Sequence, residues 1–272
     1  MTAPTVLIDI FEGIATLTLN RPDRGNAWNQ AMSRDYVAAL QNAARSADVR
    51  AIVLTGAGKA FCTGGDSEVL GGVAEKGGVD EGDRAHTGGL TDHLIALRVG
   101  KPVIGAINGA CFGIGMQQAL CCDMRIGSHE AKFSTAFARR GVIGEMGITW
   151  LLPRLVGTGH ALDLLLSARL VRAPEAERMG LLNRIVPPAD LMDEARTIAR
   201  EMATKCAPSS MKAIKAQVWS DLDRDLRGSY NRASDLMDAS FSSAAFKEGV
   251  ASWQEGRDPD FPPLSGDDGL IA

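Results

Sequence analysis

The sequence predicts an α/β core followed by a region made of helices alone. Strand and helix patterns alternate as far as about residue 200, and only helical patterns follow. Two apolar strand patterns run directly into glycine-rich turns, at residues 61–66 and 109–115. The length of 272 residues allows a core domain of residues 1–200 with an appended helical region of residues 201–272.

The first two strands form a predicted hairpin. Residues 6–10 and 14–19 alternate, and Glu12-Gly13 between them favours a tight turn. The short apolar run at residues 51–55 is typical of a buried strand. Further strands are expected from Pro102 and at residues 123–126, 131–133 and 182–186.

Helices are predicted wherever apolar residues recur at helical spacing. They are expected at residues 30–44, 90–97, from 147 onward, 173–179, 191–203, 209–222 and 226–237. Residues 67–89 hold seven glycines and mixed charge with no clear period, so a flexible lid over a site or a disordered surface loop is expected. Residues 256–272, rich in proline, glycine and aspartate, are expected to form an extended tail.

The composition is that of an ordinary globular protein, and it excludes some partners. Hydrophobic residues make up 45% and charged residues 23%, and the net charge of −4 gives no general attraction to nucleic acid or to anionic membranes. The five cysteines (Cys62, Cys111, Cys121, Cys122 and Cys206) fit no metal motif. Reduced thiols, and an N-terminus without a basic and then apolar leader, predict a cytoplasmic protein.

The stretch at residues 103–127 is the most informative part of the chain. It has no charged residue as far as Cys122, and glycines stand at 105, 109, 113 and 115. A membrane helix is one interpretation, but Asn108, two glutamines and Pro102 argue against it. A buried strand–helix unit without chemistry is another. A strand, a glycine-rich turn and a helix N-terminus together also present unpaired backbone N–H groups to an anion.

The second glycine-rich turn, at residues 61–66, suggests a pair of such donors. Two backbone N–H groups on one carbonyl oxygen stabilise the negative charge that develops when a thioester becomes an enolate. Preorganised donors of this kind contribute roughly 3–4 kcal/mol each in acyl-transfer enzymes. We therefore interpret the two turns as the halves of an oxyanion hole.

Five segments, taken together, resemble the crotonase (enoyl-CoA hydratase/isomerase) superfamily. They are LNRPDRGNAWN at 19–29, AFCTGGD at 60–66, INGACFGIGMQQALCCD at 107–123, FARRGVIGEMGITWLLPRLVG at 137–157 and EGVASWQEGRDPDF at 248–261. They occur in the family's order and cover most of the chain. The resemblance implies a spiral of ββα units, C-terminal helices that form a homotrimer or a dimer of trimers, and an acyl-CoA substrate that supplies coenzyme A without a separate cofactor.

The resemblance also assigns roles to individual residues. It implies that the N–H groups of Gly65 and Ile114 are the oxyanion donors; the family usually has glycine at the second position, so Gly113 or Gly115 is an alternative. Substrate-binding positions are expected at Arg24 near the CoA phosphates, at Thr63, Gly64 and Asp66 around the adenine, and at Arg257 and Phe261, which would reach the CoA of a neighbouring subunit.

The sequence departs from the hydratase pattern at both acid–base positions. Hydratases of this family use two glutamates there, and this chain has Gln117 and Phe137, which cannot activate water. Glu145 lies in an apolar setting just before a helix, where family members that shift the double bond of an enoyl-CoA carry a glutamate. A 1,3-proton shift needs one base, and an apolar surround would raise the pKa of that carboxyl toward a useful range.

These residues favour an isomerase that moves a double bond from C3 to C2 of an enoyl-CoA. A divergent hydratase or hydrolase of the same fold, and a CoA-binding member without catalysis, remain alternatives. His86 and His93 are expected near the cleft, in the lid and the helix after it. We see no metal site, no Ser-His-Asp arrangement and no GxxxxGK loop.

Overall fold

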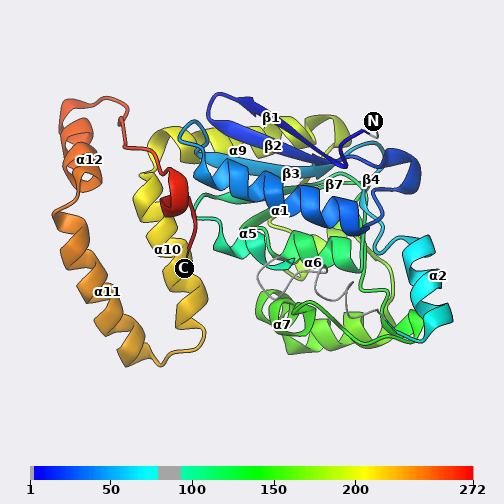
Figure 1. Cartoon of the computed structure of the whole chain (residues 1–272). Coiled ribbons are helices and arrows are strands. Elements are labelled where there is room, and N and C mark those ends of the chain that lie inside the picture. Colours follow the sequence, from blue (N-terminus) through cyan, green and yellow to red (C-terminus); the bar gives the residue numbers. More distant parts are fainter. Residues whose placement is uncertain (1–2, 79–92, 272) are drawn as a thin grey trace.

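Two sheets form the centre of the molecule. This computed structural model describes residues 3–78 and 93–271 (Figure 1). The larger sheet has the order β1-β2-β3-β5-β7-β10 and the smaller one β4-β6-β8-β9. The strands of the larger sheet are β1 (Val6–Phe11), β2 (Ile14–Leu19), β3 (Ala51–Gly56), β5 (Val103–Ile107), β7 (Met124–Ser128) and β10 (Arg184–Val186). Those of the smaller sheet are β4 (Ala60–Cys62), β6 (Ala110–Phe112), β8 (Lys132–Ser134) and β9 (Val171–Arg172).

The chain follows a spiral path that alternates between the two sheets. Each turn places one strand in the larger sheet and the next strand in the smaller one, as in β3-β4, β5-β6 and β7-β8. Because every turn repeats this path, β3, β5 and β7 are mutually parallel, and so are β4, β6 and β8. The predicted α/β fold class, with its spiral of ββα units, is confirmed. So is the N-terminal hairpin, in which Phe11 pairs with Ile14 across the turn.

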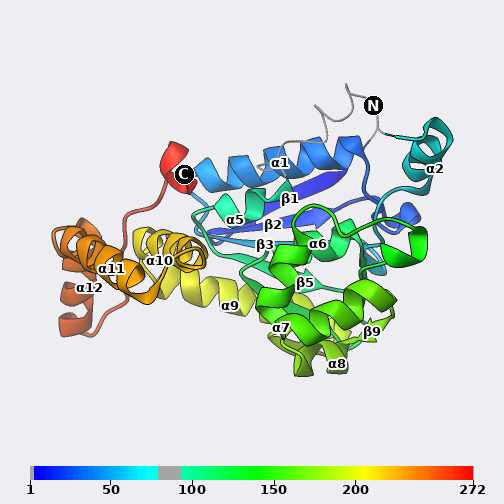
Figure 2. The ribbon, with the colours of Figure 1, turned by 90° about the horizontal axis from the view of Figure 1, so that it is seen from below.

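Helices cover both faces of the larger sheet, because its strands are apolar on both sides. On one face the core joins Leu17 and Leu54 to α1 (Gln30–Arg45), α6 (Ile114–Leu120) and α7 (Ile148–Ser167). On the other face Val53 and Ile104 pack against α9 (Leu191–Lys205). Figure 2 shows α1 and α9 on opposite sides of the strands.

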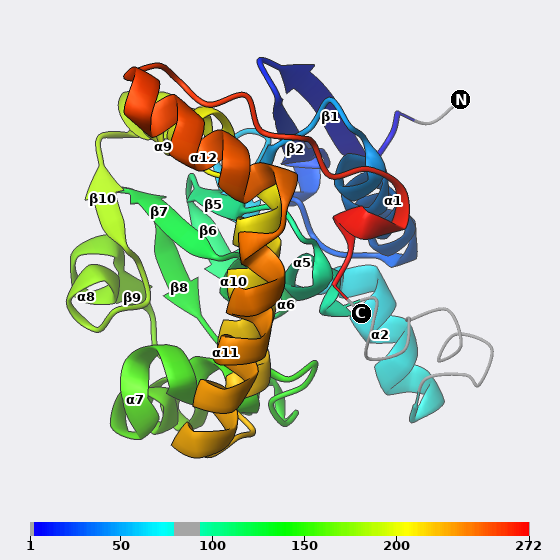
Figure 3. The same ribbon diagram turned by 90° about the vertical axis from the view of Figure 1, so that its left-hand side faces the viewer.

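The C-terminal helices extend away from the sheets. They are α10 (Pro208–Asp221), α11 (Leu226–Phe241) and α12 (Ala244–Glu255), and Figure 3 views the molecule from their side. Only α10 is tied to the core by a buried ion pair: among the described residues, Lys215 Nζ donates to Asp123 Oδ2 (2.8 Å) and to the carbonyl of Ala96 (2.9 Å) in α5 (Ile95–Arg98).

The tail has no helix or strand over residues 258–265, in line with the predicted extended tail, but its end is anchored on the core. After α12 the chain returns to the core through the short 3-10 helix Gly266–Gly269, and Leu270 forms a β-bridge with Val99. A Cβ on Gly269 would lie 1.8 Å from the carbonyl oxygen of Ala44, so only glycine allows this close approach to α1.

The segment predicted as a lid is corrected in part. Ser67–Lys76 forms helix α2, which begins at an Asp66 N-cap and ends at Gly77 in the left-handed conformation. The remainder of that segment, together with His86 and the start of the helix predicted at 90–97, lies outside the described residues. The glycine-rich turns also contain the strands β4 and β6.

The membrane interpretation of residues 103–127 is wrong. This stretch forms β5, β6, α6 and most of β7, and its α6 has only 7 residues. Within residues 3–78 and 93–271, no helix has the length and apolar character needed to cross a bilayer. Helix α8 (Ala173–Arg178) also belongs to the core and ends shortly before β10.

Candidate active site

The two glycine-rich turns meet at one edge of the smaller sheet. Strands β4 and β6 are parallel neighbours, with Cys62 opposite Cys111, so the turns after them start side by side. A Cβ on Gly115 would lie 2.5 Å from the carbonyl oxygen of Cys62, and one on Gly113 would lie 3.8 Å from Cα of Gly64. The glycines therefore let the N-terminus of α6 pack directly against the end of β4.

The backbone around the two predicted donors is fixed on both sides. Trp28 donates its N–H to the carbonyl of Gly64 (2.8 Å) and accepts from the N–H of Asp66 (2.9 Å), which holds the Gly65 peptide between them. Ile114 is the first residue of α6, so its N–H has no acceptor within the helix. In the described chain neither amide donates to a turn, loop or cap carbonyl.

Isoleucine at position 114 is compatible with the turn. The unusual backbone conformation falls on the preceding residue, Gly113, with φ 50° and ψ −119°, whereas Ile114 has already entered the helix. Gly64, before the other predicted donor, likewise takes a φ of 104°. Each predicted donor therefore follows a glycine that supplies the unusual dihedral angle.

The carboxylate of Asp66 makes an ion pair and a hydrogen bond with its surroundings. Its carboxylate pairs with Arg21 (2.8 Å) and accepts the N–H of Glu68 (3.1 Å) as the cap of α2. Burial would raise the pKa of Asp66, but the hydrogen bond and charge of Arg21 and the Glu68 amide outweigh it, so the pKa is lowered. Asp66 thus remains ionised and holds its own turn.

The other expected CoA-binding residues lie around the same turn. The N–H of Thr63 donates to the carbonyl of Gly25 (3.0 Å), which joins the end of β4 to the loop after the hairpin. Arg24 belongs to the 3-10 helix Pro22–Arg24 in that loop and pairs with Glu68 (2.7 Å) at the surface. The structure thus brings Arg24, Thr63, Gly64 and Asp66 together beside Gly65.

Glu145 lies in the connection between β8 and α7, which has a strained backbone at both ends. Ala136 takes a φ of 62° and Met146, directly after Glu145, one of 53°. Residues other than glycine rarely adopt such φ values. These values persist where the surrounding structure enforces them. Glu145 is exposed in the single chain, yet protein around its carboxyl raises the pKa, against a smaller opposing effect of the charge of His93.

The hydratase positions are occupied by buried, non-ionisable side chains. Gln117 is 0% exposed: its Nε2 donates to the carbonyl of His93 (3.3 Å), and its Oε1 accepts from Gln118 Nε2 (2.7 Å). Phe137 is 6% exposed. Neither residue can take up or release a proton near neutral pH.

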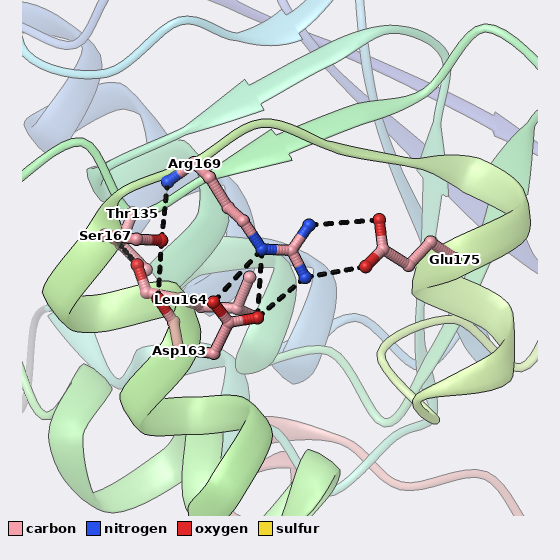
Figure 4. Close-up of polar contacts among 6 residues, drawn as sticks. All are labelled: Thr135, Asp163, Leu164, Ser167, Arg169 and Glu175. Carbon is pink, nitrogen blue, oxygen red and sulfur yellow. Dashed lines mark hydrogen bonds and ion pairs between the residues drawn. The ribbon is translucent and has the colours of Figure 1, made fainter.

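The C-terminal end of α7 anchors this connection. Thr135 Oγ1 donates to the carbonyl of Leu164 (2.7 Å), and Arg139 Nε donates to that of Ser167 (3.0 Å). Just beyond the helix, the guanidinium of Arg169 bridges Asp163 (2.7 Å) and Glu175 (2.6 Å), as Figure 4 shows. The bonds of Thr135 and Arg139 satisfy carbonyls at the end of α7 and fix the start of the connection that leads to Glu145.

Arg257 and Phe261 lie far in space from the two glycine-rich turns. Arg257 pairs with Glu248 (2.6 Å), and the ring of Phe261 packs beside Gly249 on α12. Figures 1 and 2 place α12 and α2 at opposite ends of the molecule. These two residues are therefore not part of the site formed by their own chain.

Two arginines near the site were missed from the sequence. Arg21 reaches Asp66, and Arg140 Nη1 lies 3.7 Å from the point where a Cβ on Gly64 would be. Only the three-dimensional fold brings residues 140 and 64 together, so no local pattern could have indicated the second of these contacts.

Cysteine and metal chemistry find little support at this site. Burial raises the pKa of the Cys62 and Cys122 thiols to about 12, so both stay protonated and unreactive. Among the residues that the structure describes, no cluster of three His, Cys, Asp or Glu side chains could hold a metal ion.

Comparison with known proteins identifies the class. The model of the enoyl-CoA hydratase/isomerase family matches residues 9–263. A probable enoyl-CoA hydratase of Rhodobacter capsulatus is 37% identical over 262 residues, covering 96% of this chain and 99% of the relative. The 1,2-epoxyphenylacetyl-CoA isomerase of Escherichia coli is 32% identical over 272 residues, covering 94% and 97%. The chain belongs to the enoyl-CoA hydratase/isomerase (crotonase) superfamily.

Solved structures agree with this assignment. A probable enoyl-CoA hydratase/isomerase from Mycobacterium abscessus superposes with a TM-score of 0.85 at 31% identity, covering 94% of this chain and 98% of the other. An enoyl-CoA hydratase from Polaromonas superposes with a TM-score of 0.87 at 26% identity, covering 94% and 99%. The two sheets and the C-terminal helices are therefore those of the crotonase fold.

Proposed function

We propose that the protein is an isomerase that converts a 3-enoyl-CoA into the 2-enoyl-CoA. Membership of the family implies an acyl-CoA substrate, and the proposal concerns the reaction performed on it. In this account Glu145 is the single base, and the N–H groups of Gly65 and Ile114 bind the thioester oxygen. Arg24 and the turn at Thr63, Gly64 and Asp66 would hold the CoA part.

The reaction needs one carboxylate and one oxyanion hole. The Glu145 carboxylate removes a proton from C2, and the electron pair moves toward the thioester oxygen to give a dienolate. The two amides stabilise this negative charge, and the carboxyl group then returns the same proton at C4. The double bond is left between C2 and C3, and no atom is gained or lost.

The observation that carries this proposal is the pair of buried neutral side chains at Gln117 and Phe137. Water addition requires groups that orient water and move its proton, and both positions that would supply them are closed and non-ionisable. Glu145 remains as an acid–base group with a raised pKa in the strained connection after β8. The Escherichia coli relative is also named an isomerase, but its named substrate is an epoxide, so its name does not favour a double-bond shift.

A hydratase is the second candidate. Most of the similar curated proteins, including the Rhodobacter capsulatus relative, are named probable enoyl-CoA hydratases. In that case a group other than Gln117 and Phe137 would have to position the water. A family member that binds CoA without catalysis is a further alternative, and tight CoA binding with no turnover on any enoyl chain would support it.

The direct test replaces the proposed base. In Glu145→Gln we expect turnover of 3-enoyl-CoA to fall by about 10²–10⁴-fold, with unchanged circular dichroism and unchanged affinity for CoA. Glu130→Gln, an exposed glutamate at the other end of β8, is the matched control and should retain full activity. Near-normal turnover in Glu145→Gln would remove Glu145 from the mechanism.

A further inference from the structure

Arg140 is placed over the turn that leads to the first predicted oxyanion donor. It ends the 3-10 helix Ala138–Arg140, in the connection between β8 and α7. Its Nη1 is 3.7 Å from the position that a Cβ on Gly64 would occupy, and the carbonyl oxygen of Phe112 is 3.4 Å from that same point. The guanidinium therefore lies where glycine leaves the backbone open, one residue before Gly65.

Arg140 differs from the neighbouring arginines in having no partner among residues 3–78 and 93–271. Arg21 is paired with Asp66 (2.8 Å) and Arg24 with Glu68 (2.7 Å), and Arg139 Nε donates to a backbone carbonyl (3.0 Å). Within the described part of the chain, the guanidinium of Arg140 makes no hydrogen bond and no ion pair, and the residue is exposed. Its N–H donors are thus available to a ligand.

We propose that Arg140 binds a carboxylate on the acyl group of the substrate, so that the enzyme selects thioesters of dicarboxylic acids. The planar guanidinium presents parallel N–H donors that match a carboxylate bidentately. The inference rests on the proposed function, because it places the thioester oxygen on the N–H of Gly65. Phe137, three residues before Arg140, is apolar and offers no competing anion.

The position of Arg140 favours the acyl group over the phosphates of CoA. Gly64, beside Arg140, is expected to contact CoA, but it also directly precedes Gly65, whose N–H is the predicted donor to the thioester carbonyl that carries the acyl chain. The nearest CoA phosphate is separated from the sulfur by the whole pantetheine arm, and Arg24 is the cation that the resemblance places near the phosphates. An anionic group close to the thioester is therefore the better match for Arg140.

The test is a binding measurement with unreactive ligands. Isothermal titration calorimetry would compare glutaryl-CoA with pentanoyl-CoA, which have equal chain length and differ in the terminal carboxylate. We expect the wild type to bind glutaryl-CoA about tenfold more tightly, which corresponds to one charge-assisted hydrogen-bonded contact. Arg140→Gln should abolish this preference and leave pentanoyl-CoA binding unchanged, and Arg140→Lys should retain part of it.

The controls separate this inference from the isomerase proposal. Arg172→Gln, an exposed arginine on β9, should keep the full preference. Glu145→Gln should also keep it, because neither ligand reacts, so the inference can hold even if the isomerase proposal fails. Equal affinity of the wild type for both ligands would overturn the inference. An equal loss for glutaryl-CoA, pentanoyl-CoA and free CoA in Arg140→Gln would do so too, since Arg140 would then act on the phosphates.

Discussion

At the scale of single residues, the protonation state of Glu145 controls the proposed chemistry. Desolvation raises its pKa, and a base must be ionised to remove a proton. Activity is therefore present above this pKa and is lost as the pH falls through it. We predict that the acid limb of kcat/KM against pH lies above the ordinary range of a glutamate.

The pH profile of variants checks that assignment. In Glu145→Gln the residual rate should show no such limb, because the titrating group has been removed. The exposed control Glu130→Gln should keep the limb of the wild type. A limb in the ordinary glutamate range, or one that persists in Glu145→Gln, would mean that another group titrates.

Gln117 contributes to stability through a donor that a glutamate would lack. Its Nε2 donates to the carbonyl of His93, and the side chain is 0% exposed. In Gln117→Glu a buried carboxylate oxygen would face that carbonyl. We predict a loss of about 1–3 kcal/mol in the free energy of unfolding in urea at neutral pH.

The loss in Gln117→Glu should shrink at low pH, where the new carboxyl is protonated and can donate again. The matched control is Gln254→Glu on the exposed face of α12, which should leave stability unchanged. Hydratase activity is not expected to appear in Gln117→Glu, because Phe137 still lacks a carboxyl. Unchanged stability in this variant would show that the amide contact contributes nothing.

At the scale of elements, the ion pair between Asp123 and Lys215 holds α10 on the core. The two side chains are 22% and 8% exposed. Asp123→Asn would leave the ammonium of Lys215 without its counter-charge, which typically costs about 3–5 kcal/mol of unfolding free energy. We predict that adding Lys215→Met to Asp123→Asn restores part of this stability, because the unpaired charge is then gone.

A double-mutant cycle tests this coupling. Urea denaturation is measured for the wild type, for Asp123→Asn, for Lys215→Met and for the double variant. A double variant whose loss equals the sum of the single losses would show that the two groups are not coupled.

The elements also show what the sequence could predict. Strands such as residues 14–19 and 51–55 were predicted closely because apolar periodicity fixes them. Helix α2 was missed because Gly71 and Gly72 weaken its helical signal, although Asp66 before Ser67 is a regular N-cap. The return of the tail onto α1 depends on a contact between Gly269 and Ala44, which no local pattern contains.

The candidate site likewise combines residues that the sequence could indicate with residues that it could not. The glycines indicated the two turns, because backbone donors need open turns, but only the family resemblance assigned the donors to Gly65 and Ile114, since a backbone N–H has no side-chain signature. Glu145 was indicated by the family resemblance and its apolar neighbours. Arg140 was not foreseen, because its position over Gly64 arises only when β8 and β4 lie in the same sheet.

At the scale of the whole molecule, the C-terminal helices leave much apolar surface uncovered. Leu226 is 87%, Tyr230 71% and Trp253 80% exposed in the single chain. Large exposed apolar patches usually mark interfaces. We predict that the protein is a trimer or a dimer of trimers, as the family resemblance implies, and that Arg257 and Phe261 approach the site of a neighbouring subunit.

Light scattering after size exclusion measures this assembly. The variant Leu226→Asp with Tyr230→Asp should shift toward the chain mass of 28.8 kDa while keeping its helical content. Lys59→Asp, on the exposed loop before β4, is the matched control and should leave the assembly intact. A wild-type protein that is monomeric at micromolar concentration would contradict the prediction.

The central claim is that one carboxylate moves a double bond without adding water. A paired assay on 3-enoyl-CoA and 2-enoyl-CoA, at several chain lengths and with separated products, tests it most directly. We predict that the 3-enoyl ester is converted to the 2-enoyl ester and that no hydrated product forms from either. Formation of 3-hydroxyacyl-CoA would contradict the account, because some group other than Gln117 and Phe137 would then be activating water.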